Sequence, residues 1–150
     1  MSVFQRDIRP YIGRRSSIQV KAAVLVLNDN GEVLLLKRPR SGEWGLPSGN
    51  LKPGEALEDT AARELWEESG LVADRLRLLD LFSGPRYVKK HPGGDEEYYV
   101  IGLYGADGVR SAINMPQGKD SEVSLKYFGF DELPKLDPLA VRLLDHIGQS

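Results

Sequence analysis

The stretch that decides the fold is Gly49–Leu71, with the sequence GNLKPGEALEDTAARELWEESGL. Residues 56–69 are good helix formers, and Gly70 follows them where a left-handed helix cap is expected. This pattern predicts a helix over 56–69. At about 100° per residue, one stripe of this helix carries three glutamates: Glu64, Glu67 and Glu68. The neighbouring arc is apolar and is expected to pack on a sheet: Ala61, Ala62, Leu65 and Trp66.

Three carboxylates on one helical stripe repel one another, because like charges at this spacing destabilise a helix. If the carboxylates were partly buried, they would need cations to hold them or would take up protons. Carboxylate oxygens are hard ligands that suit Mg²⁺ or Mn²⁺. The plainer alternative is an exposed acidic stripe in which Arg63 offsets Glu67, one turn away.

The flanking segments read as strands and a second helix. Residues 18–27 and 32–37 are rich in Val, Leu and Ile, and the intervening Asn-Asp-Asn-Gly predicts a tight hairpin turn with positive φ angles. Further strands are expected at 76–82, 98–104 and 124–130, with a long loop at 105–121. Residues 138–147 predict a terminal helix that Asp137 caps. The order of these elements favours an α/β fold, with helices on the faces of a mixed sheet.

The whole chain has 150 residues, 41% of them hydrophobic, which suits one domain over 1–150 with an N-terminal helix or arm at 1–16. The longest apolar run, Ala22–Leu27, is too short to span a bilayer, and the absence of cysteine fits a reducing cytoplasm. Residues 1–40 hold eight basic residues and three acids, whereas 49–71 hold six acids and two basic residues. This asymmetry fits either an anionic ligand held through metal ions or two solvated faces of opposite sign.

Read from Gly49, the chain gives five residues, Glu55, seven residues and then Arg63-Glu64-Leu65-Trp66-Glu67-Glu68-Ser69-Gly70-Leu71. This resembles the Nudix box, G-x5-E-x7-R-E-U-x-E-E-x-G-U with U apolar, at every specified position. The lead-in at 44–47 and the segment at 130–134 are also similar to Nudix sequences. The resemblance implies a Nudix-like α/β/α sandwich. One departure is Ser48, which stands where the family usually has glycine.

The resemblance further implies a MutT-like hydrolase that cleaves the diphosphate linkage of a nucleoside diphosphate derivative by attack of water, with Mg²⁺ as cofactor and Mn²⁺ as a substitute. The implied metal ligands are three glutamates and one backbone carbonyl: Glu64, Glu67, Glu68 and Ser48. The resemblance also implies that Glu68 or Glu64 orients or deprotonates the attacking water. Arg63 and Glu55 are the implied partners that fix these carboxylates. A later loop acid often joins such a site, and the spacing leaves Asp120 and Glu122 open as candidates.

The substrate is less sharply indicated. Arg38, Arg40 and Arg86 are candidate phosphate contacts, and Trp44 and Tyr87 are candidate walls for a base. The expected partner is a small nucleotide of the ADP-ribose, nucleotide-sugar or (d)NTP class, with an RNA end as a second option. No membrane contact is expected, and a homodimer is open. The alternative to an enzyme is a silent Nudix domain that binds a nucleotide or ADP-ribose as a sensor.

Overall fold

The computed structural model describes residues 15–112 and 124–148. Its first strands are β1 (Ser16–Leu25), β2 (Val33–Lys37), β3 (Trp44–Gly45), β4 (Ser48–Asn50) and β5 (Leu71–Val72). The later strands are β6 (Arg75–Phe82), β7 (Val88–Lys90), β8 (Glu96–Asp107), β9 (Arg110–Ser111) and β10 (Leu125–Phe128). The helices are α2 (Leu57–Ser69) and α3 (Pro138–Gly148).

The main sheet has the strand order β4-β1-β8-β6, and β7 pairs with the first residues of β8. β1 runs parallel to β8, whereas β4, β6 and β7 pair antiparallel with their neighbours. The predicted mixed sheet is therefore confirmed. Two smaller sheets, β10-β2-β3 and β5-β9, complete the strands of the described residues.

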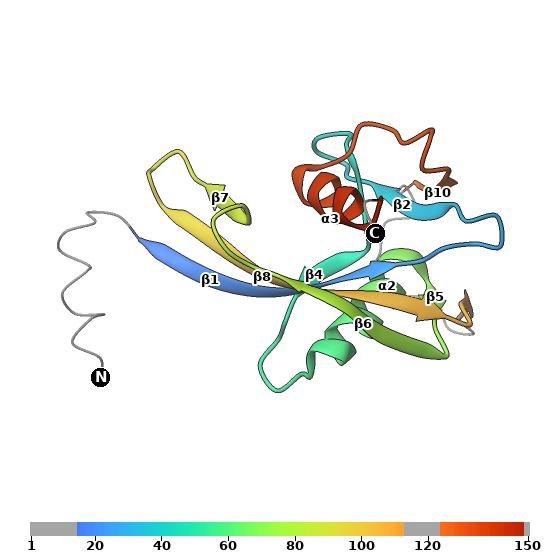
Figure 1. Ribbon diagram of the computed structural model, residues 1–150. Helices are drawn as coiled ribbons and strands as arrows, with labels where there is room; N and C mark the ends of the chain where they lie inside the picture. The colour runs from blue at the N-terminus through green and yellow to red at the C-terminus, as the bar shows by residue number, and fades with distance from the viewer. Residues whose placement is uncertain (1–14, 113–123, 149–150) are drawn as a thin grey trace.

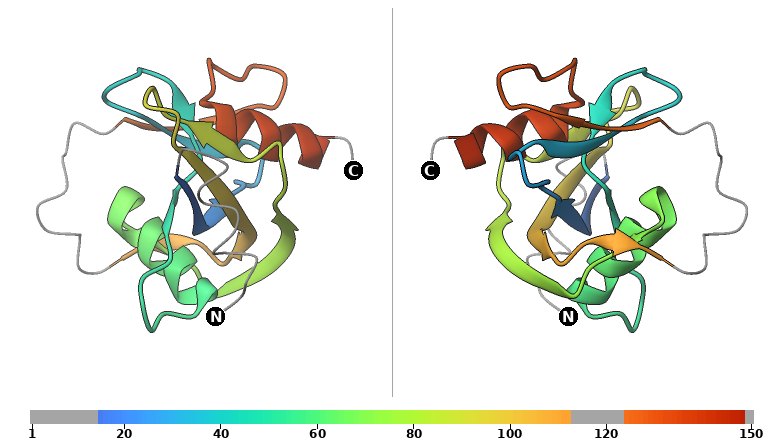
Figure 2. Two further views of the ribbon diagram at one scale, coloured as in Figure 1. Left: turned by 90° about the vertical axis from the view of Figure 1, so that its left-hand side faces the viewer. Right: turned by 90° about the vertical axis from the view of Figure 1, so that its right-hand side faces the viewer.

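Both faces of the main sheet are buried, as the alternation along β1 shows. Ala23 and Leu25 belong to a core cluster that also includes Leu143 of α3. Ala22 and Val24 belong to a second cluster, which also holds residues of α2. Since neighbouring residues of a strand point to opposite faces, the two helices cover opposite sides of one sheet. The views of Figures 1 and 2 show this arrangement, which confirms the expected α/β/α sandwich.

The chain reverses direction between β1 and β2 as predicted, but the expected hairpin is wrong beyond its turn. Only the bridge Leu27–Val33 continues the pairing, because β4 and β8 already occupy both edges of β1. β2 pairs with β10 and β3 instead. In the turn, Gly31 alone has a positive φ, of 76°. The side chain of Asn28 accepts the amide hydrogens of residues 30 and 32, so an Asx turn closes the loop.

The remaining strand predictions are confirmed in place and corrected in extent. β8 continues to Asp107, and β9 pairs with β5. The loop expected at 105–121 is therefore partly strand, since these residues find distant pairing partners. β10 ends at Phe128. The segment 113–123 and most of the arm expected at 1–16 lie outside the described residues, and Ser16 already begins β1.

The terminal helix is confirmed, with Asp137 as its cap. The Asp137 carboxylate accepts the amide hydrogen of Ala140 at 2.8 Å, which satisfies one of the unpaired donors of the first turn. Neither helix in the described part of the chain is long and apolar enough to cross a bilayer.

Candidate active site

α2 presents the glutamate stripe next to β4. Gly70 adopts the left-handed conformation, with φ 74°, and its amide donates to the carbonyl of Trp66, which confirms the predicted cap. The buried residues of the helix are Thr60, Ala61 and Leu65. Ala62 is exposed, contrary to prediction. The helix packs on β1 and β4 through the face that carries Leu57, Ala61 and Leu65, and Ala62 lies beside that face. With this face packed on the sheet, the three glutamates of the stripe are half-buried.

Arg63 ties the stripe to the preceding loop. Its guanidinium donates to the Glu55 carboxylate at 2.7 and 3.1 Å and to the carbonyl of Asn50 at 2.9 Å. One nitrogen, Nη1, also donates to Glu64 at 2.7 Å and to Glu67 at 3.2 Å. Hydrogen bonds from Arg63, followed by one from the Lys52 amide, lower the pKa of Glu55 to about 2. Arg63 thus holds three carboxylates in one charge-assisted network.

Glu68 lies on the other side of the stripe with its own partners. Its carboxylate accepts the Ser48 amide hydrogen at 2.8 Å and a hydrogen of Arg38 Nη1 at 2.9 Å. Burial raises the pKa of the Glu68 carboxyl, and the charge of Glu64 acts in the same direction. Arg38 and the Ser48 amide oppose this rise. Glu68 is therefore a desolvated carboxylate that depends on nearby positive charge.

Gly49 lets Glu64 approach the backbone of β4. A Cβ built on Gly49 would lie 2.2 Å from the Glu64 Cδ atom, well inside van der Waals contact. Gly49 has no positive φ, so this close approach is its structural requirement here. Glu64 and Glu68 consequently lie against two successive residues of one strand.

Of the expected metal ligands, Glu64 and Glu68 lie against this strand and Glu67 contacts Arg63, and the donors of all three suit a hard divalent cation. The half-buried stripe offers carboxylate oxygens, and the backbone approaches as closely as a glycine permits. In the arrangement of the described residues, however, Arg63 and Arg38 hold the carboxylates, and no three acidic or histidine side chains converge on one point. Asp120 and Glu122 lie outside the described residues.

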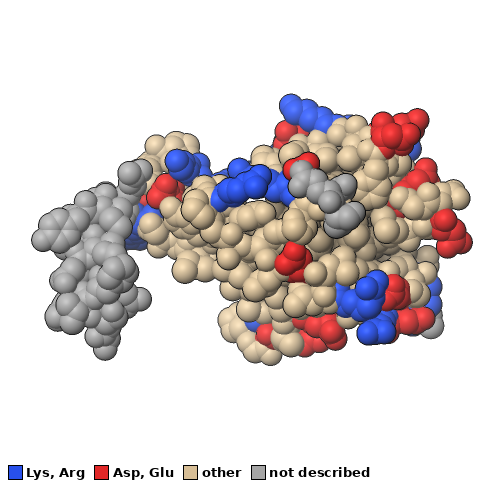
Figure 3. All heavy atoms as spheres, viewed as in Figure 1, with Lys and Arg blue, Asp and Glu red and all other residues tan. Residues whose placement is uncertain are grey.

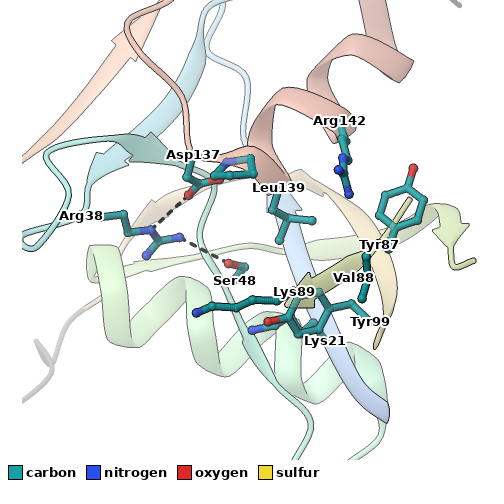
Figure 4. Close-up of a pocket in the computed structure, with 11 residues that line it drawn as sticks. Lys21, Arg38, Ser48, Tyr87, Val88, Lys89, Tyr99, Asp137, Leu139 and Arg142 are labelled. Atoms are coloured by element: carbon teal, nitrogen blue, oxygen red, sulfur yellow. Dashed lines mark hydrogen bonds and ion pairs between the residues drawn. The ribbon is translucent and has the colours of Figure 1, made fainter. Parts of the chain in front are cut away.

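A cleft of about 460 Å³ adjoins the carboxylates. Ser48 and Arg38 line this cleft and also donate hydrogen bonds to the Glu68 carboxylate. Of the predicted substrate contacts, Arg38 and Tyr87 line this cleft (Figure 4). Arg40 and Arg86 are exposed and do not line it. Trp44 packs edge-on against Phe128 with ring centroids 4.9 Å apart, so it serves the core of the smaller sheet.

The cleft also contains residues that sequence reasoning missed: Lys21, Val88, Lys89, Tyr99, Leu139 and Arg142. Lys21 carried a signal, since it is the one charged residue within the apolar run of β1 from Ile18 to Leu25. The other residues come from distant strands and from α3, and nothing local marks them. They become neighbours only when β7, β8 and α3 assemble around β1.

Solved structures share this sandwich and its helix. A MutT NUDIX hydrolase from Burkholderia pseudomallei superposes with a TM-score of 0.68 at 26% identity, covering 87% of this chain and 98% of that one. A family model described as NUDIX domain matches residues 17–147. The chain therefore belongs to the Nudix hydrolase family, as the box predicted.

Two sequence relatives are more specific in name. A Bacillus subtilis (strain 168) protein named "Putative 8-oxo-dGTP diphosphatase" is 38% identical over 96 residues. That match covers 61% of this chain and 60% of the relative, so the shared part is less than two thirds of that protein. An RNA pyrophosphohydrolase of Erythrobacter litoralis is 29% identical over 132 residues, covering 77% of this chain and 78% of that protein.

Proposed function

We propose that the protein is a pyrophosphohydrolase that uses Mg²⁺ to cleave the diphosphate linkage of a small nucleotide derivative. The observation that carries the proposal is the set of three half-buried glutamates that two arginines contact beside a cationic cleft. A site that concentrates carboxylates next to cations suits a polyanionic substrate held through a metal ion.

In this proposal Glu64, Glu67, Glu68 and the Ser48 carbonyl hold the divalent ion that Nudix hydrolases generally use. When bound, the ion neutralises charge on the phosphate oxygens and lowers the pKa of water. Arg63 and Glu55 act as positioning residues, because their hydrogen bonds fix the glutamate rotamers. Glu68, the desolvated carboxylate, is suited to accept a proton from water, since its pKa lies above the usual range.

Two findings support hydrolysis over a sensor role. Every specified residue of the box is present, and its carboxylates are held in two neighbouring groups, one around Arg63 and one in which Glu68 accepts from the Ser48 amide and Arg38. The relatives named above are a diphosphatase and a pyrophosphohydrolase, both of which act on phosphoanhydride bonds by name.

The test is a screen of nucleotide substrates with Mg²⁺ or Mn²⁺, covering dNTPs, ADP-ribose, nucleotide sugars and a 5′-triphosphate RNA. We expect metal-dependent turnover that EDTA abolishes and that Glu68→Gln reduces by at least about 100-fold. Glu58→Gln is the matched control, because Glu58 lies on the same helix but is exposed and outside the network. Tight nucleotide binding without turnover of any substrate would overturn the proposal in favour of a sensor.

A further inference from the structure

The cleft beside the carboxylates has a strong charge imbalance. Four of its lining residues are cationic: Lys21, Arg38, Lys89 and Arg142. Among the described lining residues, the only carboxylate is that of Asp137, which contacts Arg38 at 3.5 Å and caps α3. In the space-filling view, basic side chains gather between β7 and α3 (Figure 3). The surplus of positive charge favours a ligand with several negative charges.

Two of these cations lie over aromatic rings of the cleft. Lys21 Nζ lies 5.0 Å from the centre of the Tyr99 ring, and the Arg142 guanidinium lies 5.8 Å from the centre of the Tyr87 ring. The Tyr99 hydroxyl donates to Glu97 at 2.6 Å, which fixes the ring. Each ring therefore presents a face to a cation. One face of each tyrosine is therefore taken by a cation and is not available to a nucleobase.

Lys21 is placed between the cleft and the glutamate stripe. It is half-buried on β1, opposite Asn50 of β4. The charge of Glu97 acts on it most strongly, followed by those of Arg38, Glu64 and Lys89. Figure 4 shows Lys21 and Lys89 side by side at Tyr99. Within the described residues, no carboxylate lies within 4.0 Å of either ammonium group. Two neighbouring ammonium groups that no carboxylate contacts directly are stabilised when an anion lies between them.

We propose that this cleft is a phosphoryl site: Lys21, Lys89 and Arg142 bind a phosphoryl group that extends beyond the diphosphate held at the glutamates. The preferred substrate class is then a nucleoside 5′-triphosphate. This inference rests on the proposed function, because it takes the glutamates as the place where the substrate's diphosphate is bound.

The alternative classes fit the cleft less well. Nucleotide sugars and ADP-ribose carry only two phosphates, and both would be bound at the glutamates that hold the metal ion. Their remaining group is a neutral sugar, which would leave the ammonium groups of the cleft facing hydroxyls. A triphosphate instead provides a further charged phosphoryl group for charge-assisted hydrogen bonds.

The first test measures binding without catalysis. Inorganic tripolyphosphate is titrated by calorimetry in EDTA against the wild type, Lys21→Met and Lys89→Met. We expect each variant to weaken binding by about 10-fold or more, the scale of one hydrogen bond to a charged group. Lys126→Met is the matched control, because Lys126 Nζ also lies over a ring, 5.2 Å from the centre of Phe128, but outside the cleft. Equal affinity in all four proteins, or no binding by the wild type, would overturn the inference.

The second test separates the inference from the proposed function. With Mg²⁺, we expect Lys21→Met to lower kcat/KM for dATP by about 10- to 100-fold and to change that for UDP-glucose far less. Because Lys89 is exposed, Lys89→Met provides the same comparison if Lys21→Met does not fold. Hydrolysis of sugar nucleotides in preference to triphosphates would overturn the phosphoryl site but not the proposed function. Tripolyphosphate binding that depends on Lys21 and Lys89, without hydrolysis of any substrate, would support the site and overturn the function.

Discussion

Gly49→Ala tests whether the position of Glu64 matters for activity. The added Cβ would lie 2.2 Å from Glu64 Cδ and 2.3 Å from Oε1, whereas ordinary contact is 3.4–4 Å. The carboxylate must therefore move by about 1 Å, because Gly49 lies in a strand paired with β1 and has little freedom to shift. A misplacement of about 1 Å at a catalytic group can cost about 100-fold in rate. We expect kcat/KM to fall by that amount.

Stability should change far less than activity in this variant. The backbone of Gly49 has no positive φ, so alanine introduces no backbone strain and reduces the entropy of the unfolded chain. That gain offsets part of the weakened contact between Glu64 and Arg63. We expect the free energy of unfolding to change by about 1 kcal/mol or less.

The assay combines steady-state kinetics with urea unfolding monitored by tryptophan fluorescence. Gly93→Ala is the control, since a Cβ there meets nothing within 4 Å and the φ of Gly93 is also not positive. Wild-type activity of Gly49→Ala would refute the requirement for Glu64 at this place. If the free energy of unfolding fell by as many kcal/mol as the activation free energy rose, the view that the glycine is needed for the site and not for the fold would be refuted.

Three further predictions concern the network and the cap. Arg63→Lys replaces a fork that serves three carboxylates with a single ammonium, so the free energy of unfolding should fall by about 1–3 kcal/mol in urea titrations; unchanged stability would contradict the role of the fork. The folded-state pKa of Glu55 is about 2, below its usual 4.5, so its stabilising contribution is present above pH 4.5 and is lost as the pH falls toward 2. The Tm difference between wild type and Glu55→Gln should shrink over that range, and a constant difference would argue against it. Asp137→Ala should cost about 0.5–2 kcal/mol by removing the α3 cap, whereas Asp137→Asn keeps an acceptor and should cost less; equal thermal losses would rule out capping as the cause.

The order of elements and the glutamate stripe could be predicted because both depend on local pattern. A helix is defined by its own periodicity and by Gly70 at its end, so the 13 residues of α2 follow from the sequence. The box likewise placed Arg63 and Glu55 beside the carboxylates, and in the structure Arg63 contacts Glu55, Glu64 and Glu67, whereas Glu68 has separate partners. Arg63 and Glu55 are eight positions apart, and a helix beginning between them brings them into contact.

Strand pairing was not determined locally. The turn at 28–31 predicted a hairpin, but β1 pairs with β8, whose residues lie about 80 positions further along the chain. The same long-range assembly explains why Ala62 is exposed, since the face that a helix buries depends on which strands it meets. Periodicity predicts which residues share the apolar face of the helix, whereas contact with the sheet decides which of them are buried.

The sequence by itself determined the carboxylate end of the site, because a helix and its preceding loop hold those residues in one short segment. Only the tertiary structure decided the cleft. Lys21, Lys89 and Arg142 come from β1, β7 and α3, and they meet because β8 pairs with both strands and α3 packs over the same face. The physical reason is that hydrogen bonds within a helix connect near neighbours, whereas sheet pairing and burial of apolar surface connect residues at any separation along the chain.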